Sequence, residues 1–485
     1  MTMPDAQPIT QPLAPEEFPI PFGIEAETGE LLPGLTDDDV ARISTDADGP
    51  EVRERGERGA AEHLAIADID PNNLEEAGWC VVFPKNIDPA IPKALAPLFE
   101  HRQAEARRLF KVFDGTSGVL PGETARQWIE RQGAGFSIVD PEHGVPLYVL
   151  LVGSPSEIPF EFQYLLDLYW NVGRLHFDTP GEYRTYAEHV IAYEQATTLP
   201  HRKHAAIFSV KNDGDRATGL LHDQVTRPLV TGTELVRPLA NFKGFQLTPL
   251  LAGDATKARL LSLLAGEEAG GPPAFLFTGS HGVKFRMTDS LQREKQGAIL
   301  CQDWPGFGAT TAEHLVTAAD LPDGGALHGL IHFFFACYGG GCPTEDNFGL
   351  TSAQPPRQLV PEPIVARLPQ RLLTKGALAS LAHVDRAWAY SFQNSRSVPQ
   401  VQEMRDVMVR ILQGQRIGQA TDGFNMRWAV LSAELQESQN LRESISAQLV
   451  SNAQLANRYV ARNDARNYVI LGDPATRLRT AAMAS

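Results

Sequence analysis

Two short segments combine a reactive side chain with a neighbouring glycine. The segment 274–282 ends in His281 and Gly282, and the segment 331–342 contains Cys337 directly after an apolar run. A thiol becomes a nucleophile when an imidazole can take its proton, so the two side chains predict covalent chemistry if they meet in space. In that arrangement Cys337 is the nucleophile and His281 the base, while the backbone N–H groups of Gly282 and Cys337 can hold an oxyanion.

Each element also has a plainer interpretation. A lone cysteine after an apolar strand is commonly a structural thiol, and His-Gly is a common turn. His332 is predicted to point to the opposite face of the Cys337 strand and to be a core residue, while His383 is the reserve base. A disulfide between Cys337 and Cys342 would silence the nucleophile, and the pair lacks the spacing of zinc ligands, so no metal site is predicted.

The elements that must position these residues alternate along the chain. Continuous apolar runs predict strands at 146–152, 205–210, 274–278, 330–336, 377–382 and 468–471. Amphipathic stretches predict helices at 161–173, 183–197, 255–264 and within 398–463. This order predicts an α/β sandwich with a mostly parallel central sheet. Ligands of such sheets bind beyond the carboxyl ends of the strands, where His281 and Cys337 would face each other.

The chain divides into four regions by composition. Residues 1–60 hold 14 acidic residues, four Arg, no Lys and eight Pro, which is typical of a disordered tail or a pro-segment. Residues 61–144 are predicted to be a helical N-terminal region, 145–397 the catalytic domain, and 398–485 a helical C-terminal region with a final strand. The Arg-rich patch 53–58 looks exposed and accessible to a protease.

Composition excludes several classes of function. The 485 residues carry a net charge of −16, which argues against nucleic acid or an anionic membrane as the main partner. The apolar runs are much shorter than the roughly 20 residues of a membrane helix, and no secretory signal is visible. Four cysteines are too few for a disulfide scaffold. These observations predict a soluble, cytoplasmic protein.

The His-Gly and Ala-Cys segments resemble those of the caspase–hemoglobinase fold cysteine peptidases (clan CD), most closely the gingipain-type and bacterial caspase-like proteases. His281 precedes Cys337 by 56 residues, against about 50 in caspases. The similarity extends to segments 148–159, 172–175, 381–388 and 471–474, so it spans about 145–475. It implies a caspase-like αβα sandwich, with Cys337 as nucleophile, His281 as base and no cofactor.

The same resemblance implies a substrate pocket. Caspases have Gln where this chain has Phe335, so specificity for Asp is unsupported. Gingipain-type enzymes that prefer Arg place an Asp at the base of the pocket, and here the resemblance implies Asp215, with Asp213 second, and Trp388 on the wall. A carboxylate and an indole both suit a guanidinium. The alternatives are that Asp-Gly-Asp is only a turn and that Trp388 is a core aromatic residue.

These observations together predict an intracellular cysteine endopeptidase that cleaves protein or peptide substrates after Arg or Lys. A protease with such broad specificity would be hazardous if always active, so a zymogen is expected, activated by an upstream protease in a stress or defence cascade. The acidic tail, or the loop 283–298 with its four basic residues, would block the cleft until it is cut. The alternatives are a catalytically silent scaffold or sensor that binds a protein partner, and a ligase in which an amine intercepts the thioester.

Overall fold

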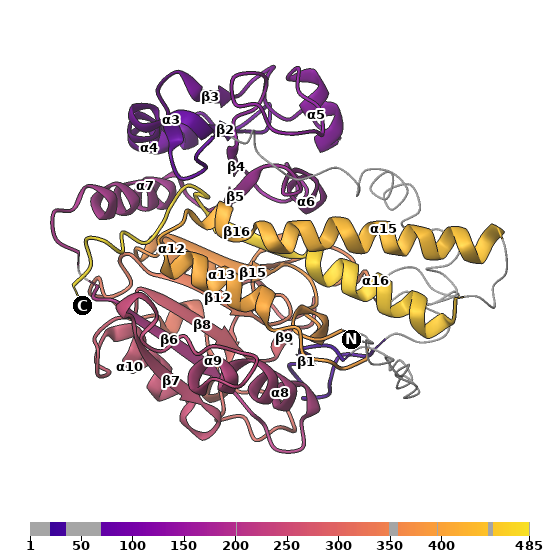
Figure 1. Cartoon of the computed structure of the whole chain (residues 1–485). Coiled ribbons are helices and arrows are strands. Elements are labelled where there is room, and N and C mark those ends of the chain that lie inside the picture. The colour runs from indigo at the N-terminus through magenta and orange to yellow at the C-terminus, as the bar shows by residue number, and fades with distance from the viewer. Residues whose placement is uncertain are drawn as a thin grey trace, which may run out of the picture.

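The central element of the protein is a ten-stranded sheet (Figure 1). The computed structural model describes residues 20–34, 69–199, 201–348, 357–394, 396–444 and 450–484. The strand order is β3-β2-β4-β5-β16-β15-β12-β8-β6-β7. Within these residues every adjacent pair of the sheet is parallel except β15 and β16. The predicted α/β class with a mostly parallel central sheet is therefore confirmed.

The strands of this sheet are short apolar runs. They are β2 Trp79–Val82, β3 Phe110–Phe113, β4 Tyr148–Val152, β5 Asn171–Leu175, β6 His204–Ser209, β7 Gln246–Leu251, β8 Phe275–Gly279, β12 Ile331–Phe335, β15 Ala379–His383 and β16 Tyr468–Gly472. The inner eight are buried along their whole length, whereas the edge strands β3 and β7 are partly exposed, as expected for a parallel sheet covered on both faces. All six predicted strands are present, with ends within two residues of the predicted ones.

Further strands form two-stranded pairs. These are β1 Gly23–Glu25 with β9 Gly282–Lys284, β10 Ile299–Leu300 with β11 Leu315–Val316, and β13 Gly341–Cys342 with β14 Ile364–Val365. The helices that cover the sheet are α3 Leu74–Ala77, α4 Ala90–Ala106, α5 Ala125–Arg131, α6 Phe160–Leu166, α7 Pro180–Gln195, α8 Arg216–Leu220, α9 Arg227–Thr231, α10 Lys257–Ala265, α11 Gln292–Lys295, α12 Arg367–Thr374, α13 Gln402–Leu412, α14 Ile417–Ala420, α15 Asp422–Ser444 and α16 Asn452–Arg466. Among the described helices, none combines the length and apolarity that a membrane span requires.

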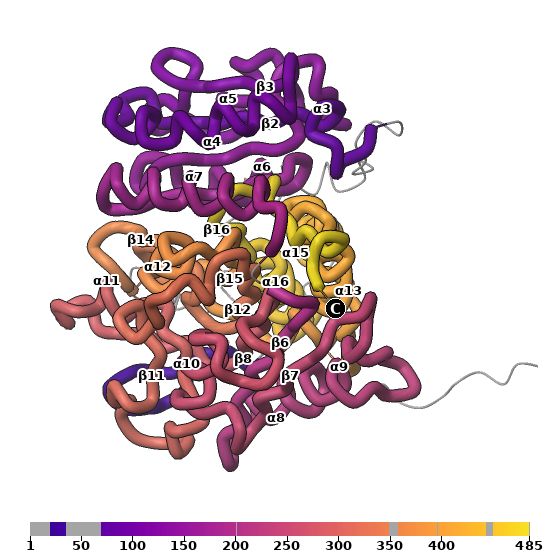
Figure 2. The backbone as a smooth tube through the Cα atoms, turned by 90° about the vertical axis from the view of Figure 1, so that its left-hand side faces the viewer, coloured from indigo at the N-terminus to yellow at the C-terminus, as the bar shows by residue number. Residues whose placement is uncertain are grey.

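The N-terminal region, predicted to be mostly helical, contains α3, α4 and α5 but also β2 and β3, which extend the sheet there (Figure 2). Four residues are too few to show a clear period in the sequence. Strand β5 overlaps the end of the predicted helix 161–173 and was missed because Gly173 and Arg174 interrupt its apolar run. A Cβ at Gly173 would lie 2.2 Å from the Gly472 carbonyl oxygen, so glycine permits β5 and β16 to approach. Arg174 is buried, and its guanidinium donates to Gln163 and to nearby backbone carbonyls.

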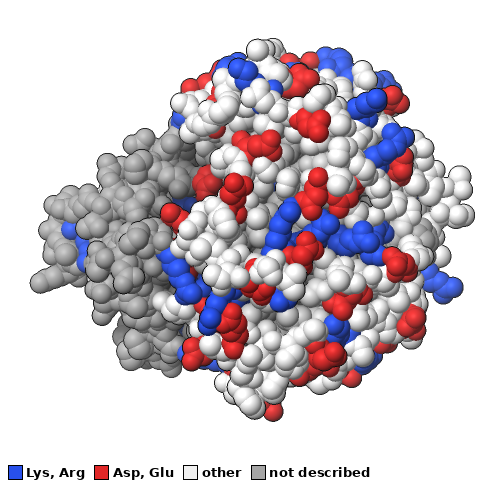
Figure 3. Space-filling view, turned by 180° about the vertical axis from the view of Figure 1, so that it is seen from behind, with Lys and Arg blue, Asp and Glu red and all other residues white. Residues whose placement is uncertain are grey.

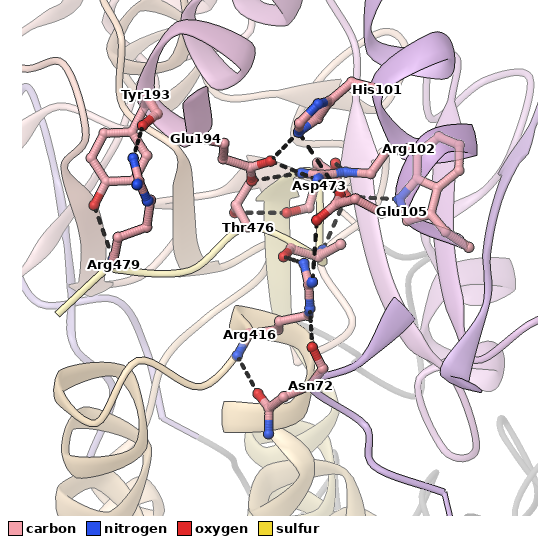
Figure 4. A network of polar contacts seen from close by, with 12 residues as sticks. Asn72, His101, Arg102, Glu105, Tyr193, Glu194, Arg416, Asp473, Thr476 and Arg479 are labelled. Atoms are coloured by element: carbon pink, nitrogen blue, oxygen red, sulfur yellow. Dashed lines mark hydrogen bonds and ion pairs between the residues drawn. The ribbon is translucent and has the colours of Figure 1, made fainter. Parts of the chain in front are cut away.

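A buried polar network joins the N-terminal elements to the end of the chain (Figure 4). Arg102 of α4 donates to Asp473, which follows β16, at 2.7 Å and to Glu194 of α7 at 2.7 and 2.8 Å. Trp79 of β2 donates its indole N–H to Asp473 at 3.0 Å. Burial disfavours the charge on Arg102, but the carboxylates of Asp473 and Glu194 outweigh it and raise the pKa. The Leu-Gly-Asp-Pro segment thus anchors the sheet.

One cluster in this network has the residue types of a metal site. The ligand atoms of His101, Glu105 and Glu194 lie within 4.8 Å of one another. However, Arg102 pairs with both carboxylates and is itself buried. The guanidinium therefore already supplies the positive charge that these carboxylates need.

Charges of both signs are interspersed on the described part of the rear surface (Figure 3). Lys and Arg side chains stand beside Asp and Glu over most of this face. A surface of this kind does not create the one-signed field that steers a charged polymer. Function is therefore better sought at the edge of the sheet.

Candidate active site

Cys337 and His281 come from adjacent strands in matching register. Strands β8 and β12 are parallel neighbours, and their last residues, Gly279 and Phe335, are direct partners. His281 and Cys337 each lie two residues beyond these partners. Because both strands run in the same direction, the two side chains reach the same edge of the sheet. The condition for this arrangement, that the two strands are neighbours, is therefore met.

His281 is fixed by a carboxylate. Its Nε2–H donates to Asp215 Oδ2 at 2.6 Å, and both side chains are buried. Asp215 caps α8 and also accepts bonds from the Ala217 and Thr218 N–H groups and the Thr218 hydroxyl. Burial raises the pKa of Asp215, but the hydrogen bond and charge of His281 outweigh it and lower that pKa to about 2. An ionised carboxylate therefore orients the imidazole.

The other nitrogen of His281 is left available for proton transfer. Nδ1 is buried and has no hydrogen-bond partner in the described part of the chain. The ring centroid lies 6.1 Å from that of Phe22, whose carbonyl group approaches the thiol. An imidazole held at one nitrogen and free at the other has the form of a general base.

Two of the three residues expected to bind the substrate, Asp215 and Trp388, make other contacts in the structure. Asp215 contacts His281 and not the base of a pocket, because the loop after β6 passes beside the end of β8. Asp213 is exposed on the same loop. The ring of Trp388 is buried against Phe348, with centroids 5.0 Å apart, in a cluster that includes α16 residues. The Trp388 side chain is therefore a core aromatic residue, which was the alternative interpretation. Only the Trp388 backbone faces the site.

Residues 20–34 of the acidic tail cover this edge of the sheet. The carbonyl oxygen of Phe22 accepts from the N–H of Gly282 at 2.9 Å and from the N–H of Cys337 at 3.1 Å. These are the two groups that the sequence predicts as oxyanion donors. The N–H of Phe22 donates to the Ala387 carbonyl at 2.9 Å, and Pro21 forms an antiparallel bridge with Trp388. A peptide segment thus lies in an extended form across the thiol.

The residue after Phe22 passes directly over the nucleophile. A Cβ on Gly23 would lie 2.9 Å from Cys337 Sγ and 2.5 Å from a methyl group of Leu32. Only glycine permits so close an approach. From Gly23 the segment continues as β1, parallel to β9 and paired with it from Gly282 to Lys284.

Basic side chains of the loop 283–298 hold the segment in place. Lys284 Nζ lies 2.6 Å from Glu25 Oε1, and Arg286 Nε lies 2.5 Å from Glu27 Oε2. The other two basic residues of this loop pair with acids elsewhere, Arg293 with Asp178 and Lys295 with Asp289. The expected cleavage patch 53–58 lies outside the described residues.

The covered thiol lies in surroundings that favour its neutral form. Cys337 is 1% exposed, and its Sγ accepts from the Ala387 N–H at 3.3 Å. Burial raises the pKa of the Cys337 thiol, and the Ala387 N–H opposes this only in part. All four cysteines are free, so Cys342 forms no disulfide with Cys337.

The two remaining histidines of interest are enclosed. His332 is buried between Thr278 and Ser380, at 2.8 and 3.3 Å, as predicted for a core residue. His383, the reserve base, donates to Asp464 at 3.1 Å and is covered by the ring of Tyr468. Neither ring nitrogen of His383 bonds to the covering segment.

Sequence reasoning missed Phe22 and Ala387. Phe22 lies in an apolar stretch, Phe18 to Ile24, within an otherwise acidic tail. That contrast was the available signal, since a disordered tail does not need such a stretch. Ala387 acts only through its backbone groups, so no residue type could have revealed it.

Comparison with known proteins gives only remote likenesses. No family model and no curated protein matches the chain. A solved structure described as a protease has a TM-score of 0.45 and 14% identity, covering 83% of this chain and 78% of that one. A complex of Porphyromonas gingivalis RgpB pro- and mature domains has a TM-score of 0.42 and 14% identity, covering 83% and 80%. A Saccharomyces cerevisiae separase–securin complex has a TM-score of 0.28 and 15% identity, covering 68% and 16%.

Proposed function

We propose that the protein is a cysteine endopeptidase held in a latent form. Cys337 is the nucleophile, His281 the general base and acid, and Asp215 the carboxylate that orients His281. The observation that carries this proposal is the Phe22 carbonyl oxygen, which accepts from both Gly282 and Cys337. A peptide carbonyl bound by two N–H groups beside a thiol is the arrangement that acyl transfer requires.

The reaction follows from these positions. Nδ1 of His281 takes the proton of the Cys337 thiol, and Sγ attacks the carbonyl carbon of the bound peptide. The N–H groups of Gly282 and Cys337 stabilise the negative charge that develops on the oxygen, and losing one such donor typically costs about 10²–10³-fold in rate. The C–N bond breaks, and His281 gives its proton to the leaving amine. Water, deprotonated by His281, then hydrolyses the thioester and restores the thiol.

Latency follows from the covering segment. Phe22 and Gly23 occupy the position of a substrate, and Glu25 and Glu27 are ion-paired with the basic loop. We therefore include in the proposal a zymogen that an upstream protease activates. Action inside the cell, in a stress or defence cascade, is part of the proposal on the strength of the sequence resemblance.

We do not propose cleavage after Arg or Lys. That specificity was tied to an acid at the base of the pocket, with Asp215 as the first choice. Asp215 is held by His281 and by the N-terminus of α8, so it is not available for a guanidinium.

The test is activity against a peptide library of varied sequence and against denatured casein, before and after limited proteolysis. We expect little activity in the intact protein, a gain after cutting, and none in Cys337→Ala. Cys342→Ala is the matched control, because it removes a second buried thiol five residues away. Equal activity of Cys337→Ala and wild type would reject the nucleophile. An inert protein under every condition would favour the silent scaffold.

A further inference from the structure

The side chain of Phe22 marks the primary specificity pocket. The acyl-side residue of a bound substrate is the one whose carbonyl faces the nucleophile and the oxyanion donors. Phe22 has that position, since its carbonyl accepts from Cys337 and Gly282 while its N–H donates to Ala387. The next residue, Gly23, is in the place of the leaving amine. The pocket that holds the Phe22 ring is therefore the pocket for the residue before the cleaved bond.

This pocket is built from aromatic rings. The Phe22 side chain is fully buried. It packs edge to face against Phe335, with centroids 4.9 Å apart, and against Phe392, at 5.8 Å. Phe335 and Phe392 also pack against each other, at 5.8 Å. Phe335 is the residue two before Cys337, so the nucleophile's own strand provides the floor. Two rings in such contact with the occupant favour a large apolar side chain there.

The buried carboxylates around the thiol already have partners. Asp464 accepts from Trp388 N–H, His383 and the Ser391 hydroxyl. Asp385 accepts from the Asn347 amide and the Arg386 N–H. Asp215 is occupied by His281 and α8. These protein donors satisfy the carboxylates without a cation from the substrate.

An Arg side chain in this pocket would lose water without gaining a partner. Burial of an unpaired charge is costly, whereas burial of an apolar ring is favourable. We propose, on the basis of the peptidase function proposed above, that the protein cleaves after large apolar residues, Phe foremost, and that Phe22 fills this pocket in the latent state. The substrate class is thus a peptide with an aromatic residue before the cleaved bond.

The first test uses the full-length protein and reads the pocket without turnover. The rate at which iodoacetamide alkylates Cys337 is measured by mass spectrometry for wild type, Phe22→Leu and Phe22→Arg. We expect Phe22→Arg to react at least tenfold faster than wild type and Phe22→Leu to stay within about threefold. The matched control is Thr28→Arg, which adds the same charge at an exposed position of the same segment. Equal protection by Arg and Phe would overturn the proposal.

The second test measures turnover in a full-length variant whose segment no longer fits. In Phe22→Gly/Gly23→Val the ring is removed and the new Cβ collides with Cys337 Sγ. The substrates are aminomethylcoumarin amides of acetyl-Ile-Pro-Phe and acetyl-Ile-Pro-Arg, which copy the acyl side of the segment. We expect kcat/KM for Phe to exceed that for Arg by at least 100-fold, since contacts in a pocket commonly give discrimination of this order.

Pocket variants provide a readout that misfolding would not imitate. In the Phe22→Gly/Gly23→Val background, Phe335→Ala should lower the Phe-to-Arg ratio of kcat/KM by at least tenfold. Phe334→Ala is the control, because Phe334 is on the same strand, points to the other face and stacks on His332. The ratio does not depend on the amount of folded enzyme, so loss of stability leaves it unchanged.

The outcomes separate this inference from the proposed function. Preferred cleavage after Arg would keep the peptidase and reject the apolar pocket. Protection of Cys337 from alkylation by acetyl-Ile-Pro-Phe amide, but not by its Arg counterpart, with no turnover of any peptide would keep the pocket and reject the peptidase. Neither protection nor turnover would reject both.

Discussion

Two buried histidine–carboxylate pairs flank the strand that leads to Cys337, and they differ in what surrounds them. His281 follows β8 and donates to Asp215 at 2.6 Å, whereas His383 ends β15 and donates to Asp464 at 3.1 Å. Both are buried, and both leave Nδ1 without a partner among the described residues. By chemistry alone either could be the base.

The neighbours of each pair distinguish them. His383 lies between the rings of Tyr468 and Phe335, with centroids 3.8 and 5.7 Å away. His281 precedes Gly282, whose N–H holds the Phe22 carbonyl. Core residues enclose the His383 pair, whereas residues 20–34, which we propose leave the site on activation, cover the His281 pair.

Replacing each histidine in turn tests most directly which of the two is the general base. We expect His281→Gln, in the Phe22→Gly/Gly23→Val background, to lower kcat by about 10²–10⁴-fold, because it removes the general base. The same change at His383 should leave kcat per folded molecule within about threefold and lower the free energy of unfolding by about 1–3 kcal/mol, because it disturbs a buried hydrogen bond. Peptide turnover and urea unfolding measure the two effects. A larger loss of kcat in His383→Gln would reverse the assignment.

Replacing the two carboxylates, Asp215 and Asp464, should separate loss of activity from loss of stability in the same way, with smaller effects. Asp215→Asn removes the charge that orients His281, and we expect kcat to fall by roughly 10²-fold, or about 2.7 kcal/mol in the barrier. Asp464→Asn weakens the bonds from Trp388, His383 and Ser391, so its main effect should be on stability, by about 2 kcal/mol. Single-turnover rates with folded fractions measured in parallel separate the two. Unchanged kcat in Asp215→Asn would remove it from the proposed site.

Acid unfolding should report the Asp215–His281 pair. The pKa of Asp215 is lowered from 3.8 to about 2 in the folded protein. A lowered pKa stabilises the fold above the unfolded value, and this stabilisation is lost as the pH falls from about 4 to about 2. We expect wild type to lose up to about 2 kcal/mol over this range that Asp215→Asn does not lose. Urea unfolding at each pH measures the difference, with Asp213→Asn as control. A difference that stays constant with pH would contradict the pairing.

The ion pair of the covering segment should give the smallest effect. Lys284→Gln removes the contact with Glu25, which is partly buried, so we expect about 1 kcal/mol and about fivefold faster alkylation of Cys337. Lys375→Gln breaks a distant pair with Asp323 and is the control. In the same variant hydrogen exchange should rise at Gly282 N–H and not at Val384 N–H, which donates to Asn467 in the core. Equal exchange at both would mean that the two regions open together.

The sequence alone predicted the strands that lead to both histidines and to Cys337. The apolar runs before His281, Cys337 and His383 each predicted a strand and an exit at one edge of the sheet. These signals are local, because a strand buried on both faces needs consecutive apolar residues. The sequence could not distinguish His281 from His383 by contacts, and the glycine after His281, together with the resemblance, placed His281 first.

The misplaced residues share a cause. The resemblance implied that Asp215 lies in the pocket, but its partner is His281, 66 residues away. Phe22 was assigned to a tail because its neighbours are acidic and Pro-rich. In both cases the decisive contact is non-local, and neither composition nor periodicity carries information about it.

The local sequence predicted that Cys337 and His281 each follow a buried strand and lie close to a glycine, because short apolar runs and turn residues act locally. Only the tertiary structure decided that Asp215 orients His281 and that Phe22 seats its carbonyl between Gly282 and Cys337. Those contacts depend on the order of strands in the sheet and on where a distant segment packs. Burial shared among many residues stabilises these two contacts, so they can be identified only in the folded chain.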